Sequence, residues 1–247
     1  MDGDVDISAV ARLIGDRTRA SILEELSASG ALPASELARR AGVAGATASA
    51  HLAKLVAGRL LVVEPRGRHR YHRLADGSVA RALEALAVIA PPHEIRSLRH
   101  ADAAASIRAA RTCYDHLAGT LGVQLTDALE HERLIRREAE DAFTLTERGA
   151  TELRSLGLDL EEVGRGRRPF ARACLDWSER RYHLAGALGA ALTARLFELQ
   201  WIERRRPNRS VTVTELGREG LAEHFGLELV DVSATRASAA ARGSSGA

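Results

Sequence analysis

Apolar positions at the start of the chain recur at the three- and four-residue spacing of amphipathic helices. The positions that set this period are Val10, Leu13, Ile14, Ile22, Leu23 and Leu26. Gly15-Asp16 interrupts the pattern and Ser29-Gly30 ends it, so two helices with a bend between them are expected. Ser35 is then a candidate N-cap for a short helix over ELARRA, which Gly42 ends.

A further helix is predicted after the tight turn at Val43-Ala44-Gly45, and its two faces differ in composition. Ala48, Leu52 and Leu55 are spaced by four and three residues and predict the inward face. The residues left to point outward are Thr47, Ser49, Ala50, His51 and Lys54. Small and polar side chains let a helix backbone approach a DNA major groove closely, while hydroxyl groups reach bases and phosphates.

The segment LLVVEPRGRHRYHRL after Gly58 predicts a β-hairpin. Leu61-Val62-Val63 indicates one strand, Pro65 to Arg68 a turn, and His69 to Leu74 the returning strand. Three arginines surround the tip, namely Arg66, Arg68 and Arg70. Such a hairpin suits contact with phosphates or a minor groove. The alternative is an ordinary edge hairpin made soluble by charge, but its place directly after a helix-turn-helix favours the DNA interpretation.

Charge is concentrated in the same region. The whole chain has a formal net charge of only +2. Residues 39–73 nevertheless carry one acid, Glu64, against eight basic residues, which are Arg39, Arg40, Lys54, Arg59, Arg66, Arg68, Arg70 and Arg73. A short charge run is usually a solvated surface, but here the charges coincide with the motif. The distribution therefore indicates a face that binds a polyanion.

The ordered string ARLIGDRTRASILEEL and SELARRAGVAGATASAHLAKLVAGRLLVVEPRGRHRYHRL resembles the ArsR (arsenic-repressor-type) family of winged helix-turn-helix regulators. The resemblance covers roughly residues 8–90. It implies a homodimer that binds a double-stranded DNA operator and is released by an effector, with the recognition helix at Ala46–Leu55 and the wing at Val62–Tyr71. The expected DNA-binding residues are Arg39, Arg40, Ala46, Thr47, Ser49, Ala50, His51, Lys54, Arg66, Arg68 and Arg70.

The metal sites of that family are missing from this sequence. SELARRAG contains no cysteine or histidine, and the helix expected at Ser78–Ala90 is almost purely apolar, which is typical of dimer packing. His69 and His72 fall on opposite faces of the wing strand. We therefore expect neither a metal nor a cofactor from the family's usual positions.

Beyond Pro91-Pro92 the chain repeats itself. ARTCYD, HLAGTLG and FTLTERG recur in the same order as ARACLD, HLAGALG and VTVTELG, with WSERRY inserted in the second copy. Each copy predicts a long helix ending near HLAG, a second helix, a hairpin and a closing helix. The expected hairpins pair 134–136 with 143–146 and 201–204 with 211–214.

These patterns predict a mainly α fold with small β-hairpins (α+β). It comprises a winged helix-turn-helix at 1–90, two winged-helix-like repeats at about 101–160 and 165–230 within a region 91–233, and a disordered tail at 234–247.

Residues 123–149 carry seven acids against four arginines, and this surface would repel phosphates. A sensing or dimer-stabilising role is therefore expected for the repeats.

The two cysteines of the chain, Cys113 and Cys174, occupy equivalent repeat positions. They are either small buried hydrophobes or part of a thiol sensor or effector pocket. The candidate effector residues are Cys113, Tyr114, His116, Cys174, Trp177, Tyr182 and His183. With Cys113 and His116 placed on a helix at i and i+3, and His183 displaced by the insertion, a matched two-fold metal site is not expected.

The leading hypothesis is a dimeric repressor, with a thiol-based redox or electrophile sensor as the alternative of the same class. A DNA-tethered enzyme lacks support, because no nucleotide loop, nucleophile elbow, HExxH or zinc cluster occurs. A structural chromosome-binding protein would not carry the acidic first repeat. Two cysteines, an acidic polar start and no long apolar run lead us to expect a cytoplasmic protein.

Overall fold

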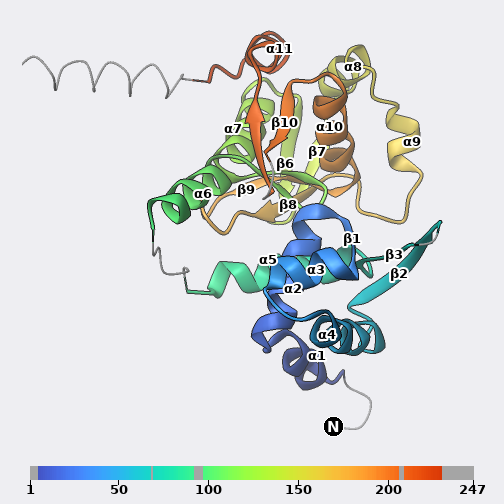
Figure 1. Cartoon of the computed structure of the whole chain (residues 1–247). Coiled ribbons are helices and arrows are strands. Elements are labelled where there is room, and N and C mark those ends of the chain that lie inside the picture. The colour runs from blue at the N-terminus through green and yellow to red at the C-terminus, as the bar shows by residue number, and fades with distance from the viewer. Residues whose placement is uncertain (1–4, 68, 92–96, 206–208, 230–247) are drawn as a thin grey trace, which may run out of the picture.

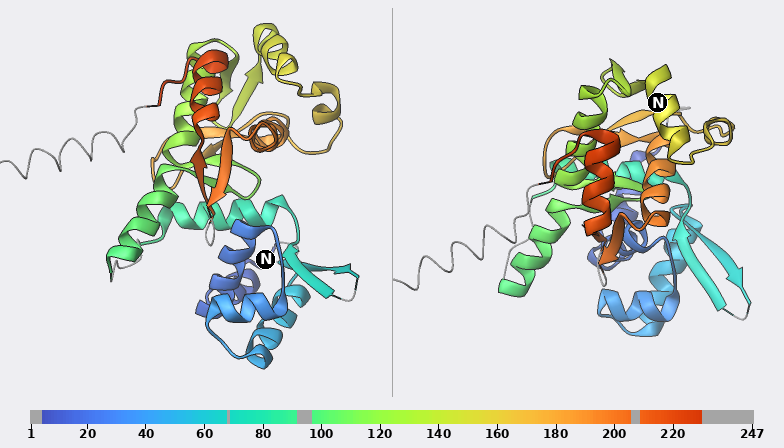
Figure 2. Two further views of the ribbon diagram at one scale, coloured as in Figure 1. Left: turned by 45° about the horizontal axis from the view of Figure 1, so that its top comes forward. Right: turned by 90° about the horizontal axis from the view of Figure 1, so that it is seen from above.

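A computed structural model describes residues 5–67, 69–91, 97–205 and 209–229 (Figure 1). The N-terminal unit has five helices, which are α1 (Ile7–Ile14), α2 (Arg17–Ser29), α3 (Ala34–Ala41), α4 (Gly45–Ala57) and α5 (Gly77–Ile89). Its sheet has the order β1-β3-β2 and contains β1 (Ala31–Pro33), β2 (Leu61–Arg66) and β3 (His69–Leu74). This is a winged helix-turn-helix, and the hairpin β2-β3 projects from its body (Figures 1 and 2).

Local sequence accounts for most of these boundaries. Asp16 separates α1 from α2 and caps α2 by accepting a hydrogen bond from the Arg19 N–H, so the predicted bend is confirmed. Gly42 ends α3 in the left-handed conformation, also as predicted. The prediction that Ser35 caps α3 was wrong: the helix begins at Ala34, directly after Pro33 with φ −73°. The sequence pattern also missed β1, a short strand that pairs with β3.

The core of this unit lies between the helices and the sheet. It is formed by Ile22, Leu23, Leu26, Leu37, Leu52, Leu55, Leu60, Leu61, Leu74, Val79 and Ala80. The set includes Ile22, Leu23, Leu26, Leu52 and Leu55, which the helical period placed inward, whereas Leu13 and Ile14 of α1 are only partly buried against it and Val10 is 39% exposed. Because the buried faces of α2, α3 and α4 are fixed by this core, the opposite face of α4 stays at the surface.

The first C-terminal copy contains α6 (Leu98–Ala109), β4 (Arg111–Cys113), β5 (His116–Ala118), α7 (Gly119–His131), β6 (Ile135–Ala139), β7 (Ala142–Leu145) and α8 (Glu147–Ser155). The second contains α9 (Leu160–Gly164), β8 (Arg172–Leu175), β9 (Tyr182–Ala185), α10 (Gly186–Glu198), β10 (Ile202–Arg205), β11 (Ser210–Val213) and α11 (Glu215–Phe225). The two predicted hairpins and both closing helices are confirmed.

The prediction that a long helix ends near HLAG in each copy was wrong. HLA forms strands β5 and β9, each the second arm of a hairpin. The following glycines, Gly119 and Gly186, have φ of +77° and +85° and begin α7 and α10. A Cβ at Gly119 would lie 2.5 Å from the Arg108 carbonyl oxygen, and one at Gly186 would lie 2.7 Å from that of Pro169. Only glycine fits this change of direction.

Each C-terminal sheet combines strands of both copies, in the orders β10-β11-β4-β5 and β6-β7-β8-β9. The junctions are equivalent, since the Val211 N–H donates to the Ala110 carbonyl and the Phe143 N–H to the Ala171 carbonyl. Two threonines make a second matched pair of bonds: Thr193 Oγ1 accepts from the Leu117 N–H at 2.9 Å, and Thr126 Oγ1 from the Leu184 N–H at 2.8 Å. The two repeats therefore form one body around a shared core.

The N-terminal unit lies on one side of this body, with α5 between the two (Figures 1 and 2). Glu84 of α5 pairs with Arg209 at 2.8 Å, and Tyr114 packs against the N-terminal core. Within the described residues, no helix combines the length and apolar character needed to cross a bilayer.

One ion pair inside the C-terminal body has no exposed atoms. Arg111 Nη2 lies 2.9 Å from Asp176 Oδ2, and both side chains have an exposure of 0%. The same carboxylate accepts from the Gly119 N–H at 2.7 Å, and the guanidinium stacks on Trp177 at 4.5 Å from the ring centroid. This pair crosses from the first copy to the second.

Asp176→Asn is expected to lower the free energy of unfolding by about 3 kcal/mol, because it leaves the Arg111 charge buried without a counter-charge. Urea denaturation would measure the decrease. Asp127→Asn is the matched control, since its partner Arg181 and Asp127 itself are 59% and 42% exposed; that change should stay within about 1 kcal/mol. Equal decreases in the two variants would contradict a structural role for the buried pair.

Candidate nucleic-acid interface and C-terminal side-chain cluster

The exposed face of α4 carries the small and polar residues that the sequence placed there. Ala48, Leu52 and Leu55 are buried. The exposed residues are Ala46, Thr47, Ser49, Ala50 and Lys54. Ser49 Oγ donates back to the Gly45 carbonyl at 2.9 Å, which leaves its lone pairs available as acceptors. The side chains on this face are mostly small and none is acidic, as a helix that enters a major groove requires.

His51 does not point outward with these residues, contrary to the sequence prediction. Its Nδ1 lies 3.5 Å from Asp16 Oδ1, and its side chain is only 17% exposed. Position 51 falls on the side of α4 that faces the beginning of α2, so the imidazole packs beside the capping carboxylate. His51 therefore positions α4 against α2.

The wing presents Arg66 and Arg70 at its exposed tip, whereas Arg68 lies outside the described residues. The Arg66 guanidinium sits 5.2 Å from the Tyr71 ring centroid and 3.1 Å from a Glu64 oxygen. Arg66 remains 58% exposed, so these contacts orient it without removing it from solvent. Figure 1 shows the hairpin extending beside α4.

Arg39 and Arg40 of α3 are engaged within the protein. Arg40 lies 2.8 Å from Glu25 and 2.7 Å from Glu36, and Arg39 lies 2.6 Å from Glu36. Hydrogen bonds from Arg39 and then Arg40 lower the pKa of Glu36 to about 2. Glu25 and Glu36 thus offset part of the positive charge that the sequence counts on α3. Arg39 nevertheless stays 69% exposed, so it carries exposed charge together with Lys54, Arg66 and Arg70, whereas Arg40 is only 20% exposed.

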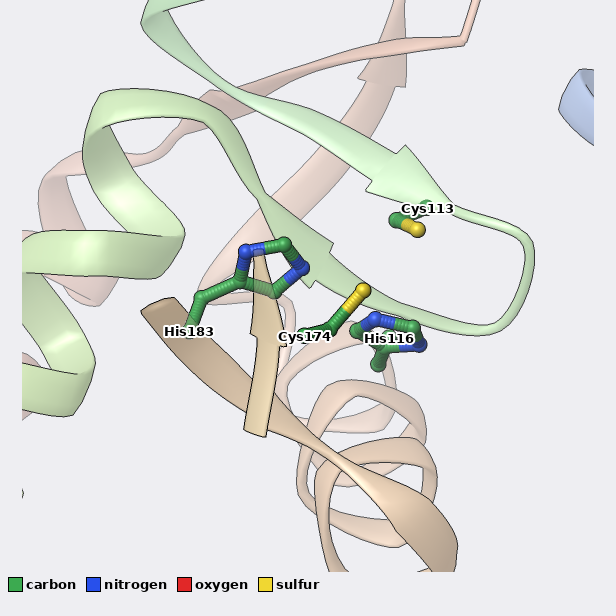
Figure 3. A group of neighbouring side chains, drawn as sticks. All are labelled: Cys113, His116, Cys174 and His183. Carbon is green, nitrogen blue, oxygen red and sulfur yellow. The ribbon is translucent and has the colours of Figure 1, made fainter. Parts of the chain in front are cut away.

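A second group of chemistry-bearing residues lies inside the C-terminal body. Cys113 and His116 face each other across the hairpin β4-β5, and Cys174 and His183 across β8-β9. One ligand atom from each of the four residues lies within 4.8 Å of all the others, and all four residues are buried. Figure 3 shows the four side chains converging from the two hairpins.

This arrangement overturns the argument against a matched pair of sites. Cys113 and His116 meet as opposite residues of a hairpin, where Cβ atoms stand about 4.5–5.5 Å apart, and not as i and i+3 of a helix. The insertion WSERRY lengthens the second turn but leaves Cys174 opposite His183. The two copies therefore present the same pair of side chains, and the expectation that the insertion displaces His183 was wrong.

The imidazoles of this cluster are incompletely satisfied. Nε2 of His116 and Nε2 of His183 are buried and have no hydrogen-bond partner. An unpaired buried polar atom costs roughly 1–3 kcal/mol. Of the other ring nitrogens, His116 Nδ1 is hydrogen-bonded to Asp115 Oδ1 at 3.2 Å, whereas His183 Nδ1 lies 3.5 Å from Asp176 Oδ2 and has no hydrogen-bond partner either. Both Nε2 atoms are thus left to the interior of the cluster.

The pKa values of the two thiols shift in opposite directions. The neighbouring Cys113 holds the pKa of Cys174 well below its usual range, and Cys174 together with burial raises the pKa of Cys113. Burial acts to lower the pKa of His116, but Asp115 and Cys174 outweigh it and the pKa is raised. Burial likewise acts to raise the pKa of Asp115, yet His116 and Arg168 bring it to about 2. The cluster therefore holds a readily formed thiolate beside two imidazoles, a donor set for a soft cation or a reactive dithiol.

The remaining predicted effector residues do not join this cluster. Trp177 stacks on Arg111, and the Tyr182 hydroxyl donates to Glu140 at 3.1 Å on the β6-β7 hairpin. Tyr114 occupies the β4-β5 turn with φ +60° and reaches the N-terminal core. Tyr114 also lines the cleft that adjoins the cluster, together with Cys113, His116 and Cys174.

Sequence reasoning missed the charged residues around the cluster, above all Asp115, Asp176 and Arg111. A signal was present, since CYD and CLD place an aspartate at the same position of each repeat. A cleft of about 400 Å³, including its open mouth, adjoins the cluster. Cys113, His116 and Cys174 line one side of it, and Gly77, Ala80, Arg81 and Glu84 of α5 line another.

Comparison with known proteins agrees with the fold. A family model described as a helix-turn-helix domain matches residues 14–64. Two solved structures similar to the N-terminal unit are a possible ArsR-family regulator fragment from Mycobacterium bovis and the cadmium sensor CmtR from Mycobacterium tuberculosis. The match to the Mycobacterium bovis fragment is 28% identical, covers 36% of this chain and 89% of that fragment, and has a TM-score of 0.32. The match to CmtR is 30% identical, covers 37% of this chain and 94% of the CmtR chain, and also has a TM-score of 0.32.

One curated relative is similar to this chain over nearly its whole length. The HTH-type transcriptional regulator YdfF of Bacillus subtilis is 41% identical over 224 residues, which are 91% of this chain and 99% of YdfF. The match therefore includes the C-terminal repeats as well as the DNA-binding unit. The chain belongs to the family of HTH-type transcriptional regulators that includes YdfF, with a helix-turn-helix domain in its N-terminal unit.

Proposed function

We propose that this regulator is a homodimeric repressor that binds an operator through α4 and the wing and is released by a signal read in the C-terminal body. The main support is the exposed face of Thr47, Ser49, Ala50 and Lys54 beside the Arg66–Arg70 hairpin. Hydroxyl and amine groups on a slim helix can reach base edges, while arginines on a projecting hairpin bind phosphates or the adjacent minor groove. The proposed place of action is the cytoplasm, and no catalytic role is included.

Dimerisation is proposed because apolar side chains at both ends of the N-terminal unit lie in water. Ile7 and Val10 of α1 are 74% and 39% exposed, and Leu86 and Ile89 of α5 are 41% and 79% exposed. A second copy of the chain would bury these residues and set two recognition helices at a fixed spacing. Operator half-sites are then expected as an inverted repeat.

Release by a signal is proposed for the C-terminal body because its buried cluster adjoins α5, the helix that directly follows the wing. A change of shape at the cluster would move α5. Because α5 is part of the proposed dimer contact, this movement would change the distance between the two recognition helices. A thiol-based redox or electrophile sensor is the second candidate, favoured by the free thiols of Cys113 and Cys174, whose sulfur atoms lie within 4.8 Å of each other. Metal binding and thiol oxidation at this pair exclude each other and can be separated by experiment.

Replacing Arg66 and Arg70 together by alanine should weaken operator binding and reduce the slope of log Kd against log salt concentration by about 0.9 for each phosphate that the protein no longer neutralises. Fluorescence anisotropy with a fragment of the chain's own promoter at several salt concentrations would measure both. Arg136→Ala, at an exposed arginine on β6 of the acidic repeat, is the control outside the wing and should leave the slope unchanged. A slope unaffected by the wing substitutions would remove the wing from the interface.

Leu86→Glu combined with Ile89→Glu should convert the dimer to monomer, because a charge would have to be buried without a partner at the proposed contact. Sedimentation equilibrium gives the mass, and operator affinity should fall with it. Leu216→Glu tests the specificity of the effect, since Leu216 is 53% exposed on α11 in the C-terminal body. If the α5 variant keeps the wild-type mass, α5 is not part of the dimer contact.

A further inference from the structure

The buried cluster in the C-terminal body has the composition of a closed metal site. Its four donors are two cysteine sulfurs and two imidazole nitrogens, and they come from four different strands, β4, β5, β8 and β9. We propose that Cys113, His116, Cys174 and His183 bind one tetrahedral divalent cation of the Zn²⁺ class between the two repeats. Two sulfurs and two nitrogens in a tetrahedron are typical of structural zinc.

The distances fit such an ion after a small contraction. Zn–S bonds of about 2.3 Å and Zn–N bonds of about 2.0–2.1 Å place tetrahedral ligand atoms about 3.3–3.8 Å apart. The donor atoms here lie within 4.8 Å of one another. An inward movement of about 1 Å shared by the side chains would complete the coordination, and no strand would have to change its register.

The hydrogen-bonding state of the histidines points to the same ligand independently. Nε2 of His116 and Nε2 of His183 are buried without partners. At each ring the opposite nitrogen faces a carboxylate, Asp115 at 3.2 Å and Asp176 at 3.5 Å. A carboxylate behind a metal-bound histidine fixes the tautomer that leaves Nε2 free to coordinate. His116 has this hydrogen bond to Asp115, whereas His183 Nδ1 lies beside Asp176 without one, since Asp176 Oδ2 already accepts from Arg111 and Gly119.

Charge selects a divalent ion. Two thiolates and two neutral imidazoles carry a charge of −2, so an ion of +2 gives a neutral site, which is what a buried position favours. Binding requires both thiols as thiolates and both imidazoles neutral, so any proton that these four ligands still carry leaves to solvent. With four protein ligands the ion keeps no open position, so the site suits a structural or sensing ion better than a catalytic one.

The position of the cluster connects it to the DNA-binding unit. Gly77, Ala80, Arg81 and Glu84 of α5 line the same cleft as Cys113, His116 and Cys174, at the junction of the two units. Beside the cluster, the Thr112 N–H donates to the Arg209 carbonyl at 3.0 Å, and the Arg209 side chain pairs with Glu84 of α5 at 2.8 Å. Contraction around an ion would therefore pull on α5. This coupling rests on the proposed repressor function, whereas metal binding by itself does not.

The site is tested with Co²⁺, a coloured substitute for Zn²⁺, added to the full-length chain in its reduced, metal-free form. We expect one Co²⁺ per chain, with the visible bands of tetrahedral cobalt and a sulfur-to-cobalt charge-transfer band, both abolished by one equivalent of Zn²⁺. Cys174→Ser and His183→Gln should lose these bands. Asp115→Asn should weaken Co²⁺ binding about 10- to 100-fold, as outer-shell partners do.

His131→Gln, an exposed histidine on α7, is the matched control and should bind Co²⁺ like the wild type. Circular dichroism and thermal unfolding without metal show whether each variant folds, and Zn²⁺ should raise the Tm of the wild type but not of His183→Gln. Tetrahedral thiolate bands that persist in both Cys174→Ser and His183→Gln would overturn the site. So would a wild-type chain that gives no thiolate band but loses two hydrogens by mass on treatment with a disulfide-forming oxidant.

The coupling is tested by promoter affinity with and without saturating Zn²⁺. We expect the ion to weaken binding at least 5-fold in the wild type, the lower end of typical coupling, and to leave the promoter affinity of His183→Gln unchanged. If Zn²⁺ binds without changing promoter affinity, the proposed coupling is overturned, whereas the proposed metal site still stands. A chain that binds Co²⁺ with thiolate bands but binds no promoter DNA in either state overturns the proposed repressor function instead.

Discussion

Neither C-terminal repeat completes a sheet alone, and each extends its strands with a hairpin of the other copy. The backbone bonds from Val211 to Ala110 and from Phe143 to Ala171 fasten these exchanged hairpins at equivalent places. Exposed strand edges would otherwise carry unpaired N–H and C=O groups. The exchange brings β4-β5 against β8-β9 and so decides where every buried polar side chain of this body lies.

The polar interior follows from that exchange. Arg111 of one copy meets Asp176 of the other, and the cysteine and histidine pairs of both copies meet between the hairpins. A buried charge or imidazole is tolerated only with partners. Arg111 has its partner in the chain, whereas the two Nε2 atoms of the cluster do not. The proposed cation is the partner that this donor set and its carboxylates fit.

The link between the two parts of the molecule is built from few contacts. Tyr114 packs on the N-terminal core, and Arg209 pairs with Glu84. Both contacts lie next to the cysteine-histidine cluster, and both reach the elements that support the recognition helix and wing. A regulator needs two arrangements that a signal can bias. A narrow, polar junction beside a binding site is a suitable place for such a change, since few packed groups must move.

The individual elements could be predicted from short stretches of sequence. Helical periodicity, Asp16, Gly42 and the turn at Pro65 to Arg68 predicted the winged helix-turn-helix, and the internal repeat predicted two equivalent C-terminal hairpins with closing helices. These features depend on a few neighbouring residues. Other features required the packed chain: that HLA is a strand, that His51 rests on Asp16, and that Glu25 and Glu36 engage Arg40. Packing also brought Cys113 and His116 to Cys174 and His183, because the contact between two sheets, made by residues about 60 positions apart, is set by the whole body and leaves no periodic mark on the chain.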